Sequence, residues 1–444
     1  MKTEVSEKVI SLIWQHQLVT NLATDMGKQL QIIYPGRVSH DCGCDFRDAV
    51  FAIDGKTAEG DIELHVKSSQ WYSHGHHQDP KYNNIALHVV MWHDSQSPTL
   101  LQNGNSIPTI YLSSFLSSSL SELNKQANLA RCPPPLCPEA TKHANREHLN
   151  KLINAAGEER FAAKIISFQK ALVREEAGQV LFFGIARALG YAKNTKPFEE
   201  LTNRLLLSFF EKAKPRTSLV KQSWILGTAG LLPSQRPKLQ HKLIKEREVE
   251  KLEIIWQASG ITEAIKEADW HFFRVRPDNF PTRRLIALSH LLDRYHKSGL
   301  LQGMVRLVKE TPPKAGRRWL ENGLTIASQG YWANHFDFGL IIKRSSALLG
   351  REKAAEITIN TILPFICAWG EIAAEPKLKK KAAEIYHCYP KLGDNELTRY
   401  MKQQLLLEPN VDLSACQQQG LIHVFKTYCR QRNCAECPIT LNQD

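Results

Sequence analysis

The chain has 444 residues, too many for one ordinary hydrophobic core, so two or three domains are expected. It is 43% hydrophobic and 23% charged, and no apolar run approaches the roughly 18 residues of a membrane-spanning helix, so no membrane partner is expected. The net charge of +12 favours an anionic partner, with nucleic acid as the first candidate. Ten cysteines without a secretion signal predict thiols or metal ligands in the reducing cytoplasm.

Residues 1–130 are predicted to form an α/β domain. An apolar stripe near the N-terminus predicts an amphipathic helix, and the apolar segments after it are separated by turn residues and read as strands. The helix is expected at Ser6–Leu18, and the strands at Leu30–Tyr34, Phe46–Ile53, Glu59–Ser68 and Ile85–Trp92, with Ile107–Leu112 as a candidate fifth. The second and third strands are expected to form a hairpin that turns at Asp54-Gly55, and the helix to pack on the apolar face of the third strand.

A proline run marks the clearest boundary in the chain. Residues 131–140 contain Pro133, Pro134 and Pro135, which cannot continue a helix or a central strand, so a linker is predicted. After it the hydrophobic period changes from about 2 to about 3.6, which predicts an all-α domain over 141–444 with a cysteine-rich tail. The predicted fold class is α+β and multidomain, with a restriction-endonuclease-like α/β domain before a larger helical domain.

The stretch from Asp41 to His93 concentrates carboxylates and imidazoles, with eight Asp or Glu and six His. Alternation along the third strand places Glu63, His65 and Lys67 on one face, about 6.6–6.8 Å apart, with an apolar face opposite. A carboxylate, an imidazole and an amine on one face suit chemistry better than core packing. Three interpretations stay open: a nuclease-like site, another ligand or metal site, and a solvated surface strand.

Metal-dependent cleavage of a phosphodiester needs two or three oxygen ligands for Mg²⁺ and a basic group near the attacking water. Asp45 precedes the second strand, 18 residues before Glu63, and this arrangement resembles the PD-(D/E)xK nucleases, as does the order of helix and strands. Glu63-x-His65 stands where those nucleases have Glu-x-Lys, and Lys67 lies one pleat further on. The resemblance implies that Asp45 and Glu63 hold Mg²⁺ or Mn²⁺, while Lys67 or His65 orients the water.

A histidine-rich loop follows that strand. His74, His76 and Asp79 are a set of ligands that suits Zn²⁺ or Mn²⁺, and a histidine there is also a candidate general base. We expect the loop to form the rim of the cleft, or an alternative metal site that includes His88. The competing interpretation is a polar loop in which Asp79 caps a turn and His88 is a hydrogen-bonded core residue.

The C-terminal tail carries Cys429-x4-Cys434-x2-Cys437, a spacing that suits one shared metal, with Cys416 or His423 as the fourth ligand. It resembles the iron–sulfur loop of helix-hairpin-helix DNA glycosylases. Its first gap is shorter and the final cysteine is missing, which favours structural Zn²⁺ over an iron–sulfur cluster. If a metal is shared, the three sulfurs should lie within about 4 Å of one another; three free thiols are the alternative.

Arginines lie among aromatic residues between Trp270 and Arg284. Such a segment can hold a phosphate backbone and stack bases, which makes it a candidate nucleic-acid-binding site. The alternative is a packing loop between helices. The arginines concerned are Arg274, Arg276, Arg283 and Arg284.

Motifs spread over essentially the whole chain are specific in combination: GCDF, GDIELHVKSSQW, HGHHQDPKYNNIALHVV, RPDNFPTRRL, INTILPF and GLIHVFKTYCRQRNCAECPI. Together they resemble an uncharacterised bacterial family, domain of unknown function (DUF) family 2851. Cys44 stands where that family usually has proline, while Asp45 and Phe46 match. The resemblance implies a bacterial origin and full-length membership, and no particular activity.

The residues favour a metal-dependent nuclease or phosphodiesterase that acts on nucleic acid. One alternative is a non-catalytic nucleic-acid-binding or scaffold protein. A second is a zinc-dependent hydrolase that uses the histidine loop. The sequence leaves open the choice between DNA and RNA, the identity of the tail metal and the oligomeric state.

Overall fold

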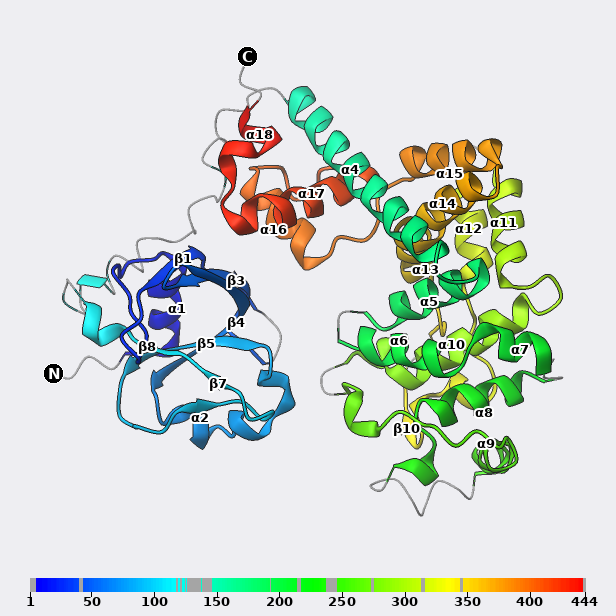
Figure 1. Cartoon of the computed structure of the whole chain (residues 1–444), viewed down its shortest axis with the longest axis horizontal. Coiled ribbons are helices and arrows are strands. Elements are labelled where there is room, and N and C mark those ends of the chain that lie inside the picture. The colour runs from blue at the N-terminus through cyan, green and yellow to red at the C-terminus, as the bar shows by residue number, and fades with distance from the viewer. Residues whose placement is uncertain are drawn as a thin grey trace. The chain divides into compact units, whose positions relative to one another are not determined.

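The computed structural model describes residues 5–39, 43–116, 119, 122–123, 125, 137, 146–191, 193–213, 217–236, 246–272, 275–312, 316–343 and 346–441. The chain divides into two compact units, which we describe separately (Figure 1). The first consists of Met1–Ile153, Glu396–Val411 and Leu421–Asp444, and the second of Asn154–Asn395 and Asp412–Gly420. An α+β protein with an N-terminal sheet region and a larger helical part is confirmed.

The predicted linker at 131–140 lies outside the described residues, apart from Cys137. The last part of the chain, which is predicted to belong to the helical domain, belongs to the unit that contains the sheet. The predicted limits of 1–130 and 141–444 therefore stay a prediction.

A mixed six-stranded sheet forms the centre of the first unit. Its strands are β1 (Leu30–Tyr34), β2 (Arg37–Val38), β3 (Phe46–Ile53), β4 (Lys56–Lys67), β5 (Ile85–Trp92) and β8 (Thr109–Tyr111). Their order is β1-β3-β4-β5-β8, with β2 beside β3. Strands β3 and β4 form an antiparallel hairpin, and β4, β5 and β8 run parallel. The hairpin turns at Asp54 and Gly55, whose φ values of 47° and 76° match the two-residue turn that suits strand twist.

One face of this sheet is apolar and packs against α1 (Glu7–Gln15). Ile62 and Leu64 of β4 share a core with Ile10 and Ile13 of the helix, and all four side chains are at most 2% exposed. Burial of each such side chain contributes about 1.5–3 kcal/mol. The predicted packing of the N-terminal helix on this face is confirmed, and residues that alternate with Ile62 and Leu64 point to the other face.

That other face has a smaller cover of its own. The chain between β4 and β5 lies over it with a hairpin of β6 (Thr99–Leu100) and β7 (Ser106–Ile107). Trp71 is fully buried there, and its ring nitrogen donates to the carbonyl of Leu100 at 2.9 Å. The polar side chains of the sheet are therefore enclosed rather than left on an open surface.

C-terminal helices complete the first unit. Phe425 of α17 (Ala415–Thr427) lies edge-on to Tyr34 of β1 and to Tyr400 of α16 (Glu396–Gln404), with 5.8 Å between ring centres in both pairs. The hydroxyls of Tyr34 and Tyr400 are 3.4 Å apart. These aromatic contacts, hundreds of residues apart in sequence, join the tail to the edge of the sheet.

The second unit is a helical array around one large apolar core. A π-helical turn (Thr358–Ile362) interrupts the path from α13 (Arg351–Ile357) to α14 (Leu363–Ile372). No helix in the described ranges combines the length and the apolar character that crossing a bilayer requires. The other long helices with residues in this unit are α4 (Arg146–Leu172), α5 (Ala177–Leu189), α6 (Thr195–Arg204), α8 (Ser218–Thr228), α9 (Arg247–Gln257), α10 (Pro281–Arg294), α11 (Leu300–Glu310), α12 (Gly316–Leu324) and α15 (Pro376–Cys388).

Candidate metal centre

The polar face of the sheet gathers three side chains from neighbouring strands. Glu63 and His65 alternate with the apolar residues of β4, so they point away from α1. His88 of β5 lies beside Glu63 in the parallel register. Glu63, His65 and His88 are 8%, 1% and 0% exposed. Buried polar groups require partners, so what surrounds these three decides what they do.

Two more histidines reach this face from the segment after β4. The one-turn helix α2 (Gln70–Ser73) ends at His74, and Gly75 then takes a φ of 76°, which residues with a side chain rarely adopt. This glycine reverses the chain, so that His76 returns to the face that His74 has just reached. His76 is buried and His74 is exposed, so the cluster opens to solvent at His74.

The ring nitrogens converge with the carboxylate. One ligand atom from each of His65, His74 and His76 lies within 4.8 Å of the others. Nε2 of His65 is 3.2 Å from Nε2 of His76. Oε1 of Glu63 is 3.4 Å from Nε2 of His76 and 3.9 Å from Nε2 of His65. A tetrahedron with metal–ligand bonds of about 2.0–2.1 Å has edges of about 3.3–3.4 Å, so this spacing suits ligands of one ion.

The donor set also suits a borderline divalent cation. Imidazole nitrogens with a carboxylate favour Zn²⁺ or a neighbouring transition metal, whereas Mg²⁺ prefers oxygen ligands. Oε2 of Glu63 is buried and has no hydrogen-bond partner among the residues that the structure describes. A cation would provide that partner. The residues present therefore fit a metal ion held by His65, His74, His76 and Glu63.

Burial sets the protonation of these groups. It raises the pKa of Glu63 to about 10, and the charge of Asp45 adds to this shift. It lowers the pKa of His65 to about 2 and that of His76 to about 4. Both imidazoles are therefore neutral near pH 7, which is the form that offers a lone pair to a metal. A bound cation would favour the ionised carboxylate of Glu63.

A hydrogen-bonded row behind His65 holds its ring. Nδ1 of His65 is 2.9 Å from Nε2 of His88, and Nδ1 of His88 is 3.2 Å from the hydroxyl of Thr99. The hydroxyls of Thr99 and Thr109 are 2.8 Å apart. When Nδ1–H of His65 donates to His88 and Nδ1–H of His88 donates to Thr99, Nε2 of His65 keeps its lone pair for a ligand. Metal-binding histidines commonly have such a partner at the second nitrogen.

Aromatic rings close the site on one side. The ring of Tyr82 lies 3.8 Å from that of His76, and the ring of Trp71 lies 5.3 Å from it. Trp71 also packs against His88 at 5.1 Å between ring centres. These contacts restrict the histidine rotamers and keep water from the buried side of the cluster.

A family model described as Protein of unknown function (DUF2851) matches residues 7–395. The chain belongs to the DUF2851 family. The matched range includes every histidine of the centre, and the resemblance seen in the sequence motifs is confirmed. Neither the comparison with curated proteins nor that with solved structures gives a match. Because membership of DUF2851 specifies no activity, function has to be argued from the site.

In this DUF2851 chain, the predicted catalytic residues Asp45 and Lys67 lie beside the centre. Oδ2 of Asp45 accepts the backbone N–H of Leu64 at 2.8 Å, and burial raises the pKa of Asp45. Lys67 is 59% exposed, with Nζ 3.9 Å from a carboxylate oxygen of Asp94. Asp45 is thus a charged neighbour of Glu63, while Lys67 lies at the solvent end of β4.

Asp79 of the histidine loop has a structural role. Its Oδ1 accepts the backbone N–H of Lys81 at 3.0 Å, which caps the short helix Pro80–Tyr82. Its Oδ2 pairs with Nζ of Lys81 at 2.8 Å. Both carboxylate oxygens are therefore used within the loop, and Asp79 shapes the rim instead of joining the histidine cluster.

The nucleic-acid-binding role predicted for Arg283 and Arg284 is corrected by their burial. They are 0% and 4% exposed, respectively. Arg283 donates to the carbonyls of Trp332, His335 and Ser346, and Arg284 donates to that of Leu348. Their guanidinium groups hold backbone segments together and do not face solvent. Arg276 is exposed, and Arg274 lies outside the described residues.

The cysteine tail does not have the predicted sulfur geometry. In the described part of the chain, the histidine cluster is the one set of three or more such ligand atoms that all lie within 4.8 Å of one another, so the sulfurs of Cys429, Cys434 and Cys437 do not all lie within the expected 4 Å or so. Burial, and then Cys437, Cys137 and Cys434, raise the pKa of Cys429, so Cys137 lies near it. Cys416 belongs to the second unit, where its thiol donates to the carbonyl of Asn154. A tail metal stays a prediction.

Sequence reasoning missed the two threonines behind His88. Thr109 lies beside His88 because β8 pairs parallel to β5, and Thr99 comes from the covering hairpin. Thr109, a polar residue at the start of a short apolar segment, was the available signal. Its position beside His88 depends on the parallel pairing of β8 with β5, which no local sequence pattern specifies.

Proposed function

We propose that this protein is a metal-dependent hydrolase that cleaves phosphodiester bonds in nucleic acid, with its metal on His65, His74, His76 and Glu63. The single observation that carries this proposal is the convergence of three imidazoles within 4.8 Å beside a buried carboxylate oxygen without a partner. This ligand set replaces the Asp45 and Glu63 pair expected from the sequence and favours Zn²⁺ or Mn²⁺ over Mg²⁺.

When bound, such an ion would lower the pKa of a water molecule and offset charge on a phosphate. The chain's own residues supply position and access. His88 orients His65, and Trp71 and Tyr82 exclude solvent from the buried side. His74 marks the exposed side, where substrate and water would enter. Asp45 keeps negative charge beside Glu63, which strengthens the attraction for a cation.

Two features support a nucleic-acid substrate. The net charge of +12 favours a polyanion. The order of a helix, an antiparallel β1-β3-β4 meander and a parallel β5 is similar to the predicted restriction-endonuclease-like arrangement, with Asp45 just before β3 and Glu63 on the adjacent β4.

A second candidate is a zinc hydrolase of esters or amides, as the sequence analysis also considered. It is favoured by the same observation, because a set of three histidines and a carboxylate is typical of zinc and is not specific for phosphate. The two candidates share the metal centre and differ in substrate, so one assay panel separates them.

The test uses the full chain, stripped of metal and reloaded with Zn²⁺, Mn²⁺ or Mg²⁺. Single-stranded DNA, duplex DNA, RNA, an aryl ester and an aryl amide would be the substrates. We expect cleavage of nucleic acid with Zn²⁺ or Mn²⁺, and its loss in His76→Ala. His77→Ala is the matched control, because the adjacent His77 stacks near Tyr72 outside the cluster. Cleavage of the ester or amide alone would favour the second candidate, and unchanged activity in His76→Ala would overturn the assigned site.

A further inference from the structure

The helical unit contains a cavity of about 630 Å³ lined by α4, α5 and the π-helical turn. This volume is in the range of pockets that bind small organic ligands. Its charge is unbalanced, with several cationic side chains and a single acidic one. The cations are Arg160, Lys164, Arg187 and Lys353, and the acid is Glu356.

The outer cations of this cavity are neutralised within the chain. Arg187 pairs with Glu199 at 2.8 Å. Lys353 pairs with Glu356 at 2.9 Å, and its ammonium lies 3.6 Å from the ring centre of Tyr191. A cation over an aromatic face is stabilised by the ring's charge distribution. These two side chains therefore leave little charge for a ligand.

The inner cations are arranged differently. Nε of Arg160 and Nζ of Lys164 both donate to one oxygen, Oε1 of Gln419, at 2.9 Å each. They lie four residues apart on α4, where like charges repel. Gln419 is 3% exposed and neutral, so it accepts the hydrogen bond of Arg160 without offsetting the charge of that guanidinium. Among the described residues, Arg160 forms no ion pair with a carboxylate, and burial lowers its pKa.

The π-helical turn completes this arrangement. Lys164 also donates to Oδ1 of Asn360, whose Nδ2 donates to the carbonyl of Glu356 at 2.9 Å. Pro364 explains the wide turn, because it has no N–H for the carbonyl of Asn360 and its ring would clash with that carbonyl in a regular helix. Such turns occur frequently at functional sites. The INTILPF motif thus places a polar residue at the two inner cations.

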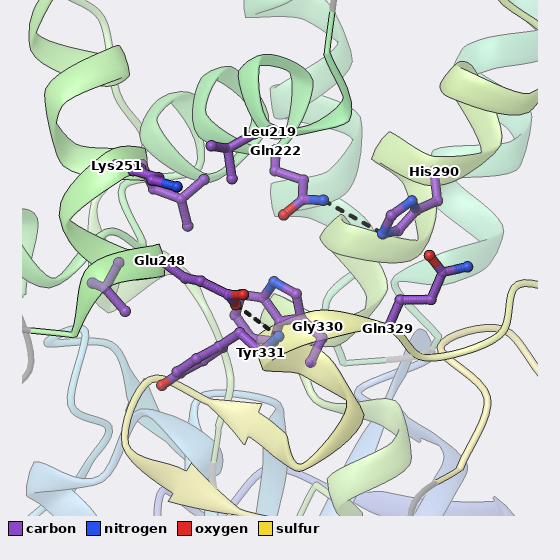
Figure 2. A pocket seen from close by; sticks show the side chains of 11 residues that line it. Leu219, Gln222, Glu248, Lys251, His290, Gln329, Gly330 and Tyr331 are labelled. Carbon is purple, nitrogen blue, oxygen red and sulfur yellow. Dashed lines mark hydrogen bonds between the residues drawn. The ribbon is translucent and has the colours of Figure 1, made fainter.

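A smaller hollow of about 290 Å³ in the same unit provides a contrast. Figure 2 shows Gln222 reaching His290, with 3.4 Å between their nitrogens, and Glu248 accepting the backbone N–H of Tyr331 at 2.7 Å. In this hollow the Gln222–His290 and Glu248–Tyr331 pairs satisfy one another. In the larger cavity, Arg160 has a neutral acceptor, Oε1 of Gln419, in place of a carboxylate.

We propose that the larger cavity binds a phosphate monoester group, with Arg160 and Lys164 as its cationic ligands. A guanidinium and an ammonium supply the charge-assisted hydrogen bonds that phosphate oxygens accept. Phe168, Phe183 and Tyr191 line the same cavity and offer apolar surface to the organic part of the ester. No residue is shared with the histidine centre, so this site stands independently of the proposed hydrolase.

Calorimetric titration of the full chain tests the proposal, with inorganic phosphate, a 5′-mononucleotide, and an oligonucleotide with and without a terminal phosphate as probes. Binding that requires the terminal phosphate would identify a nucleic-acid end as the source, and binding of the mononucleotide alone a free ester. Arg160→Met and Lys164→Met should each weaken binding about tenfold or more. Lys170→Met, at an exposed position of the same helix, should leave it unchanged.

Gln419→Glu is a second variant that does not depend on removing a cation. Its carboxylate would form an ion pair with Arg160, so the melting temperature should rise and phosphate binding should fall about tenfold or more. The proposal is overturned if no probe binds at a concentration of about 10 mM, because even a dissociation constant of about 1 mM corresponds to a binding free energy of only about −4 kcal/mol. It is also overturned if binding survives in all three variants. In metal-free protein, where the histidine centre has no ion to hold a phosphate, His76→Ala should bind inorganic phosphate and the mononucleotide as the wild type does.

Discussion

The histidine centre and the Arg283–Arg284 pair are both clusters of ionisable groups buried in the protein, one in each unit. The arginines donate to several backbone carbonyls, and these bonds account for their positions. The histidine centre has two imidazole nitrogens 3.2 Å apart and a carboxylate oxygen without a partner in the described chain. Nε of each arginine also lacks a hydrogen-bond partner in the described chain, so unsatisfied atoms alone do not distinguish the two clusters. The difference lies in the groups that meet: guanidinium donors face carbonyl acceptors, whereas the histidine centre brings atoms that can ligate a metal close to one another.

The largest effect we expect concerns the arginine cluster. Arg283→Met would leave the carbonyls of Trp332, His335 and Ser346 without their donor in a buried place. Loss of one partner of a buried charged network costs about 3–5 kcal/mol of unfolding free energy. Urea unfolding measures it, with the exposed Arg276→Met as the control, expected within about 0.5 kcal/mol of wild type. Equal losses in both variants would contradict a structural role specific to Arg283.

The next effect concerns the carboxylate of the histidine centre. Glu63→Gln keeps the side-chain volume but removes the charge that attracts a cation, so metal affinity should fall at least about 100-fold and cleavage should be lost. The melting temperature without metal should change little, because a pKa of about 10 keeps Glu63 protonated near pH 7, so a neutral amide replaces a neutral carboxyl. Metal titration and melting curves measure both. Wild-type affinity in Glu63→Gln would show that Glu63 is not a ligand.

A smaller effect is expected for the residue behind His65. His88→Ala removes the partner 2.9 Å from Nδ1 of His65, and loss of such supporting partners typically lowers metal affinity about 10–100-fold. The control is His93→Ala, an exposed position just after the same strand, which should bind metal as the wild type does. If His88→Ala had no effect, the hydrogen-bonded row would not orient His65.

The smallest effect is expected for Lys67→Met. Lys67 is 59% exposed and its weak pairing with Asp94 is worth at most about 1 kcal/mol, so metal affinity and stability should stay close to wild type. Rates of nucleic-acid cleavage should change less than about fivefold, which corresponds to the same 1 kcal/mol. A loss as large as that of Glu63→Gln would restore Lys67 as a catalytic residue of the nuclease type.

Local patterns predicted the elements of the first unit well. The alternation through Ile62, Glu63, Leu64 and His65 indicated which side chains share a face, and Asp54-Gly55 indicated the hairpin. The helix on the apolar face followed from amphipathicity alone. These predictions succeeded because each depends on residues that are neighbours in sequence.

What failed depended on distant partners. Arginines among aromatic residues look alike whether they face phosphates or backbone carbonyls, and the carbonyls of Trp332 and Ser346 lie about fifty and sixty residues further on. Asp79 was a predicted metal ligand, but its two carboxylate oxygens bind the backbone N–H and the ammonium of Lys81. These contacts compete with metal binding for the same oxygens. The sequence also ranked Asp45 as a ligand, although the neighbouring backbone N–H of Leu64 occupies one of its oxygens.

The most direct test is the metal content of the full chain after loading with Zn²⁺ or Mn²⁺ and removal of excess ion, measured for the wild type, His65→Ala/His76→Ala, His77→Ala and Cys437→Ser. The account predicts that the histidine double variant loses one ion per chain relative to the wild type, while His77→Ala loses none. Cys437→Ser reports separately on any ion held by the tail. Full metal content in the double variant would contradict the assignment of the histidine centre.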